Sequence, residues 1–262
     1  MIGANDRIEL PIGVNVQGSE LVDDVRGVRV PLNPAAVVSL RESTPASMAT
    51  ALCTSFRVEH RRAQFDALAL CARLNAALFA NVRVAAPRLL ARWLCSVLMF
   101  APLRRLPPWP PRRRAVQTSS VMAAVRSVGR GTAGAAAVVS LVTALPLAAV
   151  GVPVLGCSAG LAAGTGLVLH EVAHAIALRG SPAALIVRGV RVSLLHPKLD
   201  RRRERMVAAA GPLALVGAAL IALAAVYVFA TASAAAVPMV FALHALGLTV
   251  LAPDGRKLCA LC

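Results

Sequence analysis

Two long stretches without charged side chains dominate the second half of the chain. Residues 131–169 and 206–253 contain no Asp, Glu, Lys or Arg. Each is long enough for two membrane-spanning helices, since one crossing takes about 20 residues. Alanine, valine and leucine fill both stretches, which is typical of membrane helices that pack closely. The pattern predicts four spans, at about 133–150, 157–178, 207–230 and 234–252.

Residues 1–84 show a different pattern, because acidic and basic residues stand among apolar positions that are periodic and not continuous. The alternation at 28–32 predicts a short strand. Asn33 then caps a helix that begins at Pro34 and ends near Leu40, and Thr44 caps a second helix from Pro45 to about residue 53. These elements predict a small soluble domain.

The rest of this domain is predicted as an extended link at 56–58 followed by a long amphipathic helix from 61 to about 79. The helix is indicated by apolar residues at a spacing of three to four positions. These residues are Phe65, Leu68, Ala69, Ala72, Ala76 and Phe79.

Residues 85–130 are predicted to connect the soluble domain to a membrane domain at 131–262. An apolar segment at 88–101 is interrupted by Arg92 and followed by a run rich in proline and arginine. It is short for a span, so we expect a helix on the membrane surface, with an additional crossing as the alternative.

Composition agrees with a membrane protein. Hydrophobic residues make up 58% of the 262 positions, charged residues 15%, and mean hydropathy is +0.70, which excludes an ordinary soluble domain of this size. The expected fold class is mainly α: a polytopic α-helical membrane protein with about four spans and an interfacial helix, together with a small α+β winged-helix-like N-terminal domain.

The net charge of +16 bears mainly on how the chain is oriented in the membrane. Lysines and arginines lie beside the apolar runs, whereas the turns at 151–156 and 231–233 contain none. This distribution fits the positive-inside rule and a bilayer of anionic lipid, and it argues against nucleic acid as a partner. The start of the chain lacks the pattern of a cleavable signal peptide. We therefore expect a multi-pass protein of the cell membrane, with the N-terminus and the active site toward the cytoplasm.

The segment His170-Glu171-Val172-Ala173-His174 ends the second predicted span. On a helix, positions i and i+4 share a face, so both imidazoles can reach one zinc ion, and Glu171 is placed to activate a water molecule. Ionisable residues near a bilayer are normally retained for metal, proton or ion chemistry. The alternatives are a hydrogen-bond cluster between helices or a proton path.

Catalytic zinc needs a third protein ligand, and the candidates are Asp254, His196 and His244. Asp254 is favoured, because His174 and Asp254 each lie shortly before basic residues at the cytoplasmic end of a span. His244 would lie about 15 Å deeper along its helix. His196 is in a loop and remains the reserve ligand.

Three segments in this order resemble the site-2 protease family of intramembrane zinc metalloproteases: HEVAHAIALRG at 170–180, MVAAAGPLALVGA at 206–218 and LAPDGRKL at 251–258. The resemblance implies that His170, His174 and Asp254 bind Zn²⁺, that Glu171 is the catalytic base, and that Ala210-Gly211-Pro212 opens the helix between them. Pro253 stands where the family has leucine. Residues 185–195 fit the family's membrane-associated hairpin.

The N-terminal domain is similar to the PqqD-like peptide chaperones. The similarity rests on VRVPLNPAAVVSL at 28–40, on Thr44-Pro45 and on Phe56-Arg57-Val58 before the long helix. It implies a winged-helix domain at 1–84 that holds the leader of a ribosomally made, modified peptide as an added strand. An unrelated winged helix or a regulatory cap is the alternative.

Together, these expectations describe a zinc-dependent metalloendopeptidase that cleaves a precursor peptide during its maturation. Its partners would be that peptide or a membrane-protein substrate, the lipid bilayer, and peptide-modifying enzymes or an exporter. The alternatives are regulated intramembrane proteolysis of a signalling protein and a non-catalytic, membrane-anchored peptide-binding protein.

Overall fold

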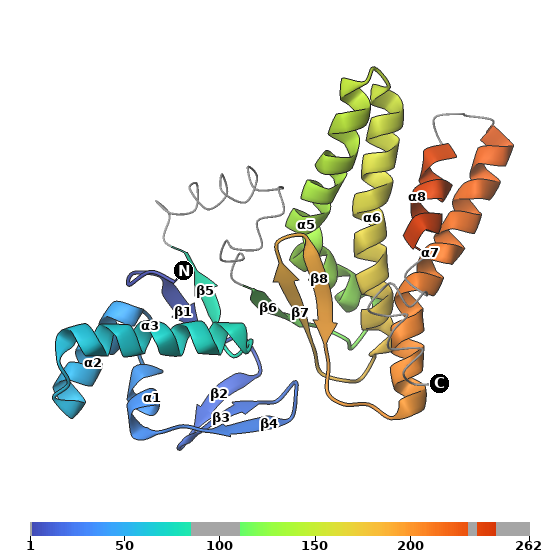
Figure 1. Cartoon of the computed structure of the whole chain (residues 1–262). Coiled ribbons are helices and arrows are strands. Elements are labelled where there is room, and N and C mark those ends of the chain that lie inside the picture. Colours follow the sequence, from blue (N-terminus) through green and yellow to red (C-terminus); the bar gives the residue numbers. More distant parts are fainter. Residues whose placement is uncertain (1, 85–110, 230–234, 245–262) are drawn as a thin grey trace. The chain divides into compact units, whose positions relative to one another are not determined.

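The computed structural model describes residues 2–84, 111–229 and 235–244. The chain divides into two compact units, Met1–Ala115 and Val116–Cys262, each with its own elements (Figure 1). The predicted surface helix at 88–101 lies outside the described residues.

The first unit contains two small antiparallel sheets. Strands β2 (Val14–Gln17), β3 (Glu20–Asp23) and β4 (Val28–Pro31) follow one another in sequence and in space, with Leu21 opposite Val30. A separate pair joins β1 (Arg7–Glu9) to β5 (Asn81–Arg83). The prediction of β4 is confirmed, whereas the sequence did not predict the other four strands.

Both predicted helix starts of this unit are confirmed. Helix α1 (Pro34–Ser39) begins after Asn33, whose side chain accepts a hydrogen bond from the Ala36 amide. Helix α2 (Pro45–Phe56) begins with a capping box between Thr44 and Ser47. The predicted extended link at 56–58 is wrong in part, because α2 includes Phe56 and ends with Arg57 in the left-handed conformation at φ 54°.

Helix α3 (His60–Ala76) is present, but the predicted face is not the buried one. Ala63, Ala67, Cys71 and Leu74 face the core, whereas Phe65 is 72% exposed. Small residues at 63 and 67 let α2 and α3 pack closely. The stripe that contains these alanines is therefore buried, and the stripe that contains Phe65 is not. The helix also ends before Phe79, because Leu78 takes a positive φ of 64°.

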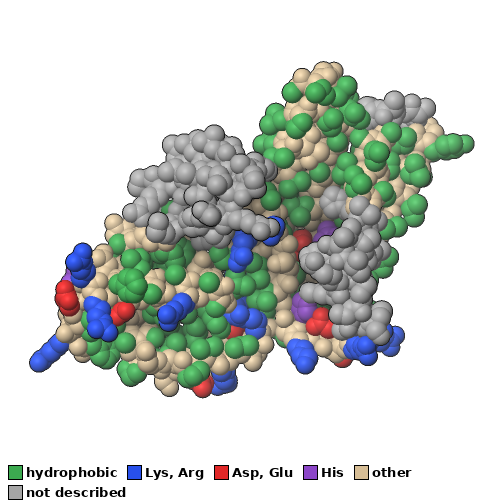
Figure 2. All heavy atoms as spheres, in the orientation of Figure 1, with side chains coloured by type: hydrophobic (Ala, Val, Ile, Leu, Met, Phe, Trp, Pro, Cys, Tyr) green, Lys and Arg blue, Asp and Glu red, His purple; other side chains and the backbone are tan. Residues whose placement is uncertain are grey.

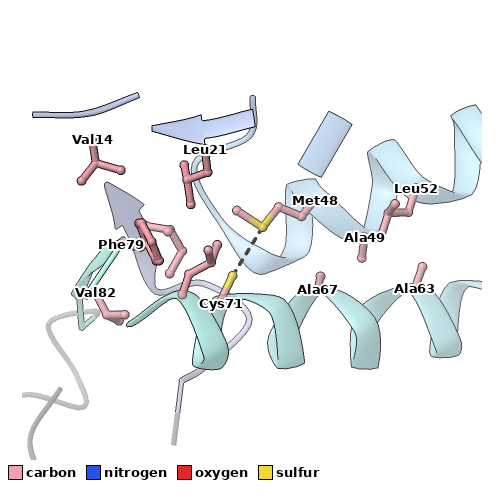
Figure 3. Packing of buried hydrophobic residues seen from close by; sticks show 13 residues of the cluster. Val14, Leu21, Met48, Ala49, Leu52, Ala63, Ala67, Cys71, Phe79 and Val82 are labelled. Atoms are coloured by element: carbon pink, nitrogen blue, oxygen red, sulfur yellow. Dashed lines mark hydrogen bonds between the residues drawn. The ribbon is translucent and has the colours of Figure 1, made fainter. Parts of the chain in front are cut away.

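The core of the first unit lies between the sheet and α3 (Figure 3). Val14 and Leu21 reach it from the strands, and Met48 lies between them and Cys71, whose sulfur is 3.4 Å from the Met48 sulfur. Burial raises the pKa of the Cys71 thiol to about 12, so this cysteine is a packing residue and not a nucleophile.

A buried ion pair joins strand β3 to Arg113, which lies near the end of the first unit. The Arg113 guanidinium donates to both carboxylate oxygens of Asp23, at 2.5 and 2.8 Å, and both side chains are almost fully buried. Arg26 donates to the same carboxylate and stacks over Phe79. Burial by itself raises the pKa of Asp23, but the hydrogen bonds from Arg113 and Arg26 outweigh it and lower the pKa to about 2.

The second unit is built from long helices and one hairpin. Strand β6 (Arg112–Val116) crosses the division between the units and leads to α5 (Val121–Ala149), α6 (Pro153–Ala177), α7 (Arg201–Phe229) and α8 (Ala236–His244). Strands β7 (Ala183–Arg188) and β8 (Arg191–Leu195) form an antiparallel hairpin between α6 and α7, as the sequence predicted. Gly189 makes its turn with φ 61°.

Helices α5, α6 and α7 are long and apolar enough to cross a membrane. In Figure 2 hydrophobic side chains, with backbone between them, are spread over the visible surface of α5 and α6. Leu141, Leu145 and Leu161 of these helices are exposed. Three of the four predicted spans thus correspond to long helices, although all three helices begin before the predicted starts. The fourth, at 234–252, lies partly outside the described residues.

Glycines bring the backbones of α5 and α6 close together. Gly156, Gly160 and Gly164 recur at every fourth position of α6 and face α5. A Cβ atom at Gly160 would lie 2.5 Å from the Ser140 carbonyl oxygen and 2.9 Å from the Ala144 Cβ. Such small-residue contacts hold membrane helices together by close van der Waals packing.

We predict that Gly160→Ala destabilises the second unit by about 1–3 kcal/mol, because the added methyl group meets backbone that must shift. Gly217→Ala, on α7, meets nothing within 4 Å and is the control. It should be neutral or stabilising, since alanine favours a helix by about 1 kcal/mol over glycine. Thermal unfolding in detergent measures both; equal melting temperatures would contradict the close contact.

We also predict that Asp23→Asn destabilises the first unit by about 3 kcal/mol at pH 7, because it leaves the Arg113 charge buried without its counter-ion. The pKa of Asp23 is lower in the folded state, so the carboxylate contributes stability above about pH 4 and loses it as the pH falls toward 2. The difference from wild type should therefore shrink over this range. Exposed Asp24→Asn is the control, with little effect at either pH.

Candidate functional site

The two histidines of the HEVAH segment lie on the last turns of α6. His170 and His174 are one helical turn apart, and their Nε2 atoms approach to 3.1 Å with the rings nearly perpendicular. Two imidazoles bound to one tetrahedral zinc ion, with Zn–N bonds of about 2.0 Å, have nitrogens about 3.3 Å apart. The observed separation fits two nitrogens that share a metal ion, and it also fits a hydrogen bond between the two rings.

The hydrogen bond on the other side of the His174 ring selects its tautomer. His174 Nδ1 lies 2.6 Å from the Val207 carbonyl oxygen of α7. A carbonyl oxygen only accepts, so Nδ1 carries the proton and the neutral ring presents a lone pair at Nε2. Metal-binding histidines are held in this way by a carbonyl or carboxylate behind the ring.

Gly211 lets α7 lie directly against this pair. A Cβ atom added there would be 2.5 Å from His174 Nε2 and 2.8 Å from His170 Cε1. Any side chain at 211 would thus meet the two imidazole rings. Pro212 follows within the helix and has no amide proton, so it cannot complete the hydrogen bond to the carbonyl four residues before it.

Buried side chains on both faces of α6 hold the motif in place. Val172 and Ala175 pack with Val207 and with Leu185 of the hairpin, whereas Ala162 packs with Leu215 of α7 and Phe241 of α8. Glu171 and His174 are only 4% and 7% exposed. The carboxylate next to the histidines therefore lies in a water-poor setting, where an acid–base group acts most strongly.

The structure brings together part of the predicted site. His170, Glu171 and His174 lie on one helix end, whereas Asp254 lies outside the described residues. His196 Nδ1 lies 4.0 Å from Glu204 Oε1 and 2.8 Å from the Pro197 carbonyl oxygen. His244 is the last residue of α8, and its side chain is not described. Within the described part of the chain, no three His, Cys, Asp or Glu side chains converge on one point.

The sequence did not predict two features of the site: the Val207 carbonyl as hydrogen-bond acceptor and Gly211 as the point of contact. The signal for Gly211 is a glycine–proline pair inside an apolar helix, which marks disturbed helix geometry and close backbone approach. Comparison with known protein families, with curated proteins and with solved structures finds no match.

If His170 and His174 hold zinc, we predict that Gly211→Ala lowers the zinc affinity about 10- to 100-fold, because the methyl group displaces both imidazoles and strains the contact behind His174. Gly217→Ala, two turns along the same helix, should keep the affinity of the wild type. Competition with a chelator of known affinity, in detergent, measures both variants. Equal affinities would show that α7 does not lie on the histidines.

Proposed function

We propose that the chain is an intramembrane zinc metalloprotease. The observation that carries this proposal is the approach of His170 and His174 Nε2 to 3.1 Å, with the Val207 carbonyl behind one ring. Gly211 lets α7 lie against both rings, so that the Val207 carbonyl can reach His174 Nδ1 and leave Nε2 for the ion. The donor set and its surroundings therefore fit zinc.

In this proposal His170, His174 and Asp254 hold Zn²⁺. The ion would polarise the scissile carbonyl and make water acidic enough to act as a nucleophile near neutral pH. Glu171 accepts the proton of the attacking water and returns it to the leaving amine. The hydrogen bond from His174 to Val207 fixes the ring so that its lone pair stays directed at the site.

The membrane setting is supported by α5, α6 and α7, which are long and apolar enough to span a bilayer. The motif lies at the end of α6 that leads to Arg179, and exposed Arg188 and Arg191 follow on the hairpin. Basic residues face the cytoplasm in most membrane proteins. We therefore place the site at the cytoplasmic side of a cell membrane.

The proposed substrate is a ribosomally made precursor peptide. Its leader would bind the first unit, which in this proposal is a winged-helix, PqqD-like domain. Strands β2 and β4 are the outer strands of the sheet β2-β3-β4, and β4 is exposed along most of its length. An extended peptide binds such an edge by main-chain hydrogen bonds. Regulated proteolysis of a membrane-bound signalling protein, with the first unit as a gate, is the alternative within proteases.

We predict that the purified wild type holds about one zinc ion per chain. It should also cleave a peptide that is first selected for binding to residues 1–84. Glu171→Gln should keep the zinc and lose at least about 100-fold in cleavage rate, because the proton acceptor is gone. Asp254→Ala and His174→Ala should lose zinc. Glu204→Gln is the matched control, and both its zinc content and its activity should equal those of the wild type. Metal analysis and mass spectrometry of the products give the two readouts.

Each outcome has a distinct meaning. If Asp254→Ala retains zinc, another residue is the third ligand, and His196 and His244 are the next positions to substitute. A wild type that binds the peptide without zinc or cleavage would make the chain a membrane-anchored peptide carrier. Cleavage of a single-span protein in place of a leader-bearing peptide would favour the signalling alternative.

A further inference from the structure

Helix α3 carries a second apolar stripe on the side opposite to the core. Phe65, Ala69, Ala72 and Ala76 follow one another at spacings of four, three and four residues, which places them on one face. The core face is formed by a different set that begins at Ala63. Phe65 is 72% exposed, although a phenylalanine is among the side chains that gain most from leaving water.

Exposed arginines border this stripe. At 100° per residue, Arg61 lies along one edge, and Arg62 and Arg73 lie along the other. The Arg62 side chain is 79% exposed, and the Asp66 carboxylate beside it lies only 4.0 Å away. The outward face of α3 is thus apolar along its middle and basic along both edges.

We propose that this face docks on the surface of an anionic lipid bilayer, with Phe65 among the acyl chains and the arginines at the phosphate groups. Helices that lie in the interface combine an apolar stripe with flanking basic residues whose long side chains reach the headgroups. The same chain contains three helices that can cross a membrane, so the first unit is covalently attached to a unit that can lie in a bilayer.

The charges favour lipid over other occupants. A second copy of the chain bound through this face would bring Arg61, Arg62 and Arg73 against the same arginines, and like charges oppose such contact. A bilayer with anionic headgroups instead offers a flat surface of opposite charge, and each arginine at such a surface changes the affinity about fivefold. This inference does not depend on zinc or on proteolysis.

The test uses the full chain reconstituted in vesicles of phosphatidylcholine, with or without phosphatidylglycerol. In Phe65→Trp the new indole reports on its surroundings, after subtraction of the wild-type signal from Trp93 and Trp109. Ile12→Trp is the matched control, since Ile12 is 76% exposed in the same unit but is not on α3. Lipids brominated in the acyl chains quench only an indole that enters the bilayer.

We expect the Phe65→Trp emission to shift to shorter wavelength and to be quenched by brominated lipid when phosphatidylglycerol is present. Ile12→Trp should remain unquenched. Reversing the charges with Arg61→Glu, Arg62→Glu and Arg73→Glu together should reduce quenching to the level seen in phosphatidylcholine alone, whereas Asp66→Asn should preserve it. Added salt should weaken quenching, because it screens the arginines.

Three results would overturn the proposal. Emission of Phe65→Trp that matches that of Ile12→Trp in every vesicle means either that α3 faces water or that the unit touches lipid without preference for this face. A blue shift without quenching means that a peptide or a second chain covers the stripe. Quenching that is equal with and without phosphatidylglycerol, and unchanged by the charge reversal, rules out recognition of anionic lipid. Zinc content, measured on the same samples, keeps this result separate from the proposed protease activity.

Discussion

The contact between α7 and the two histidines of α6 is the constraint on which the site depends. The Val207 carbonyl accepts from His174 Nδ1, and Gly211 leaves room for both rings only 3.1 Å apart at Nε2. In a bilayer a backbone carbonyl has no water to bind, so a ring N–H that reaches it satisfies two polar groups at once. One hydrogen bond thus stabilises the helix pair and fixes the tautomer that metal binding needs.

Small residues fix how the helices pack against one another. Gly156, Gly160 and Gly164 let α6 lie against the backbone of α5, and Gly211 does the same for α7 against the end of α6. Apolar attraction between helices is weak in lipid, so shape decides which faces meet. Leu185 of the hairpin β7–β8 packs in one cluster with Val172 and Ala175, whereas Phe241 packs in a second cluster with Ala162. The HEVAH turn is therefore held from two sides.

Local rules predicted much of the fold and part of the site. The caps at Asn33 and Thr44 and the shared face of His170 and His174 depend on neighbours within four residues, and the structure contains them. The stripe of α3 that becomes buried was predicted wrongly, because both stripes have helical spacing and only tertiary packing distinguishes Ala63 from Phe65. Contacts such as that of Val207 with His174, which is 33 residues away, depend on how two helices dock, and hydropathy carries no information on that.

The first unit also holds both ends of the segment 85–110. The Asn81 side chain exchanges two hydrogen bonds with the Arg113 backbone, at 2.7 and 2.8 Å, and Asn75 donates to the Pro111 carbonyl. The chain therefore leaves this unit after Val84 and is held by it again at Pro111 and Arg113. The covalent path into α5 thus starts from Arg113, a residue that Asn81 and Asp23 anchor in the first unit.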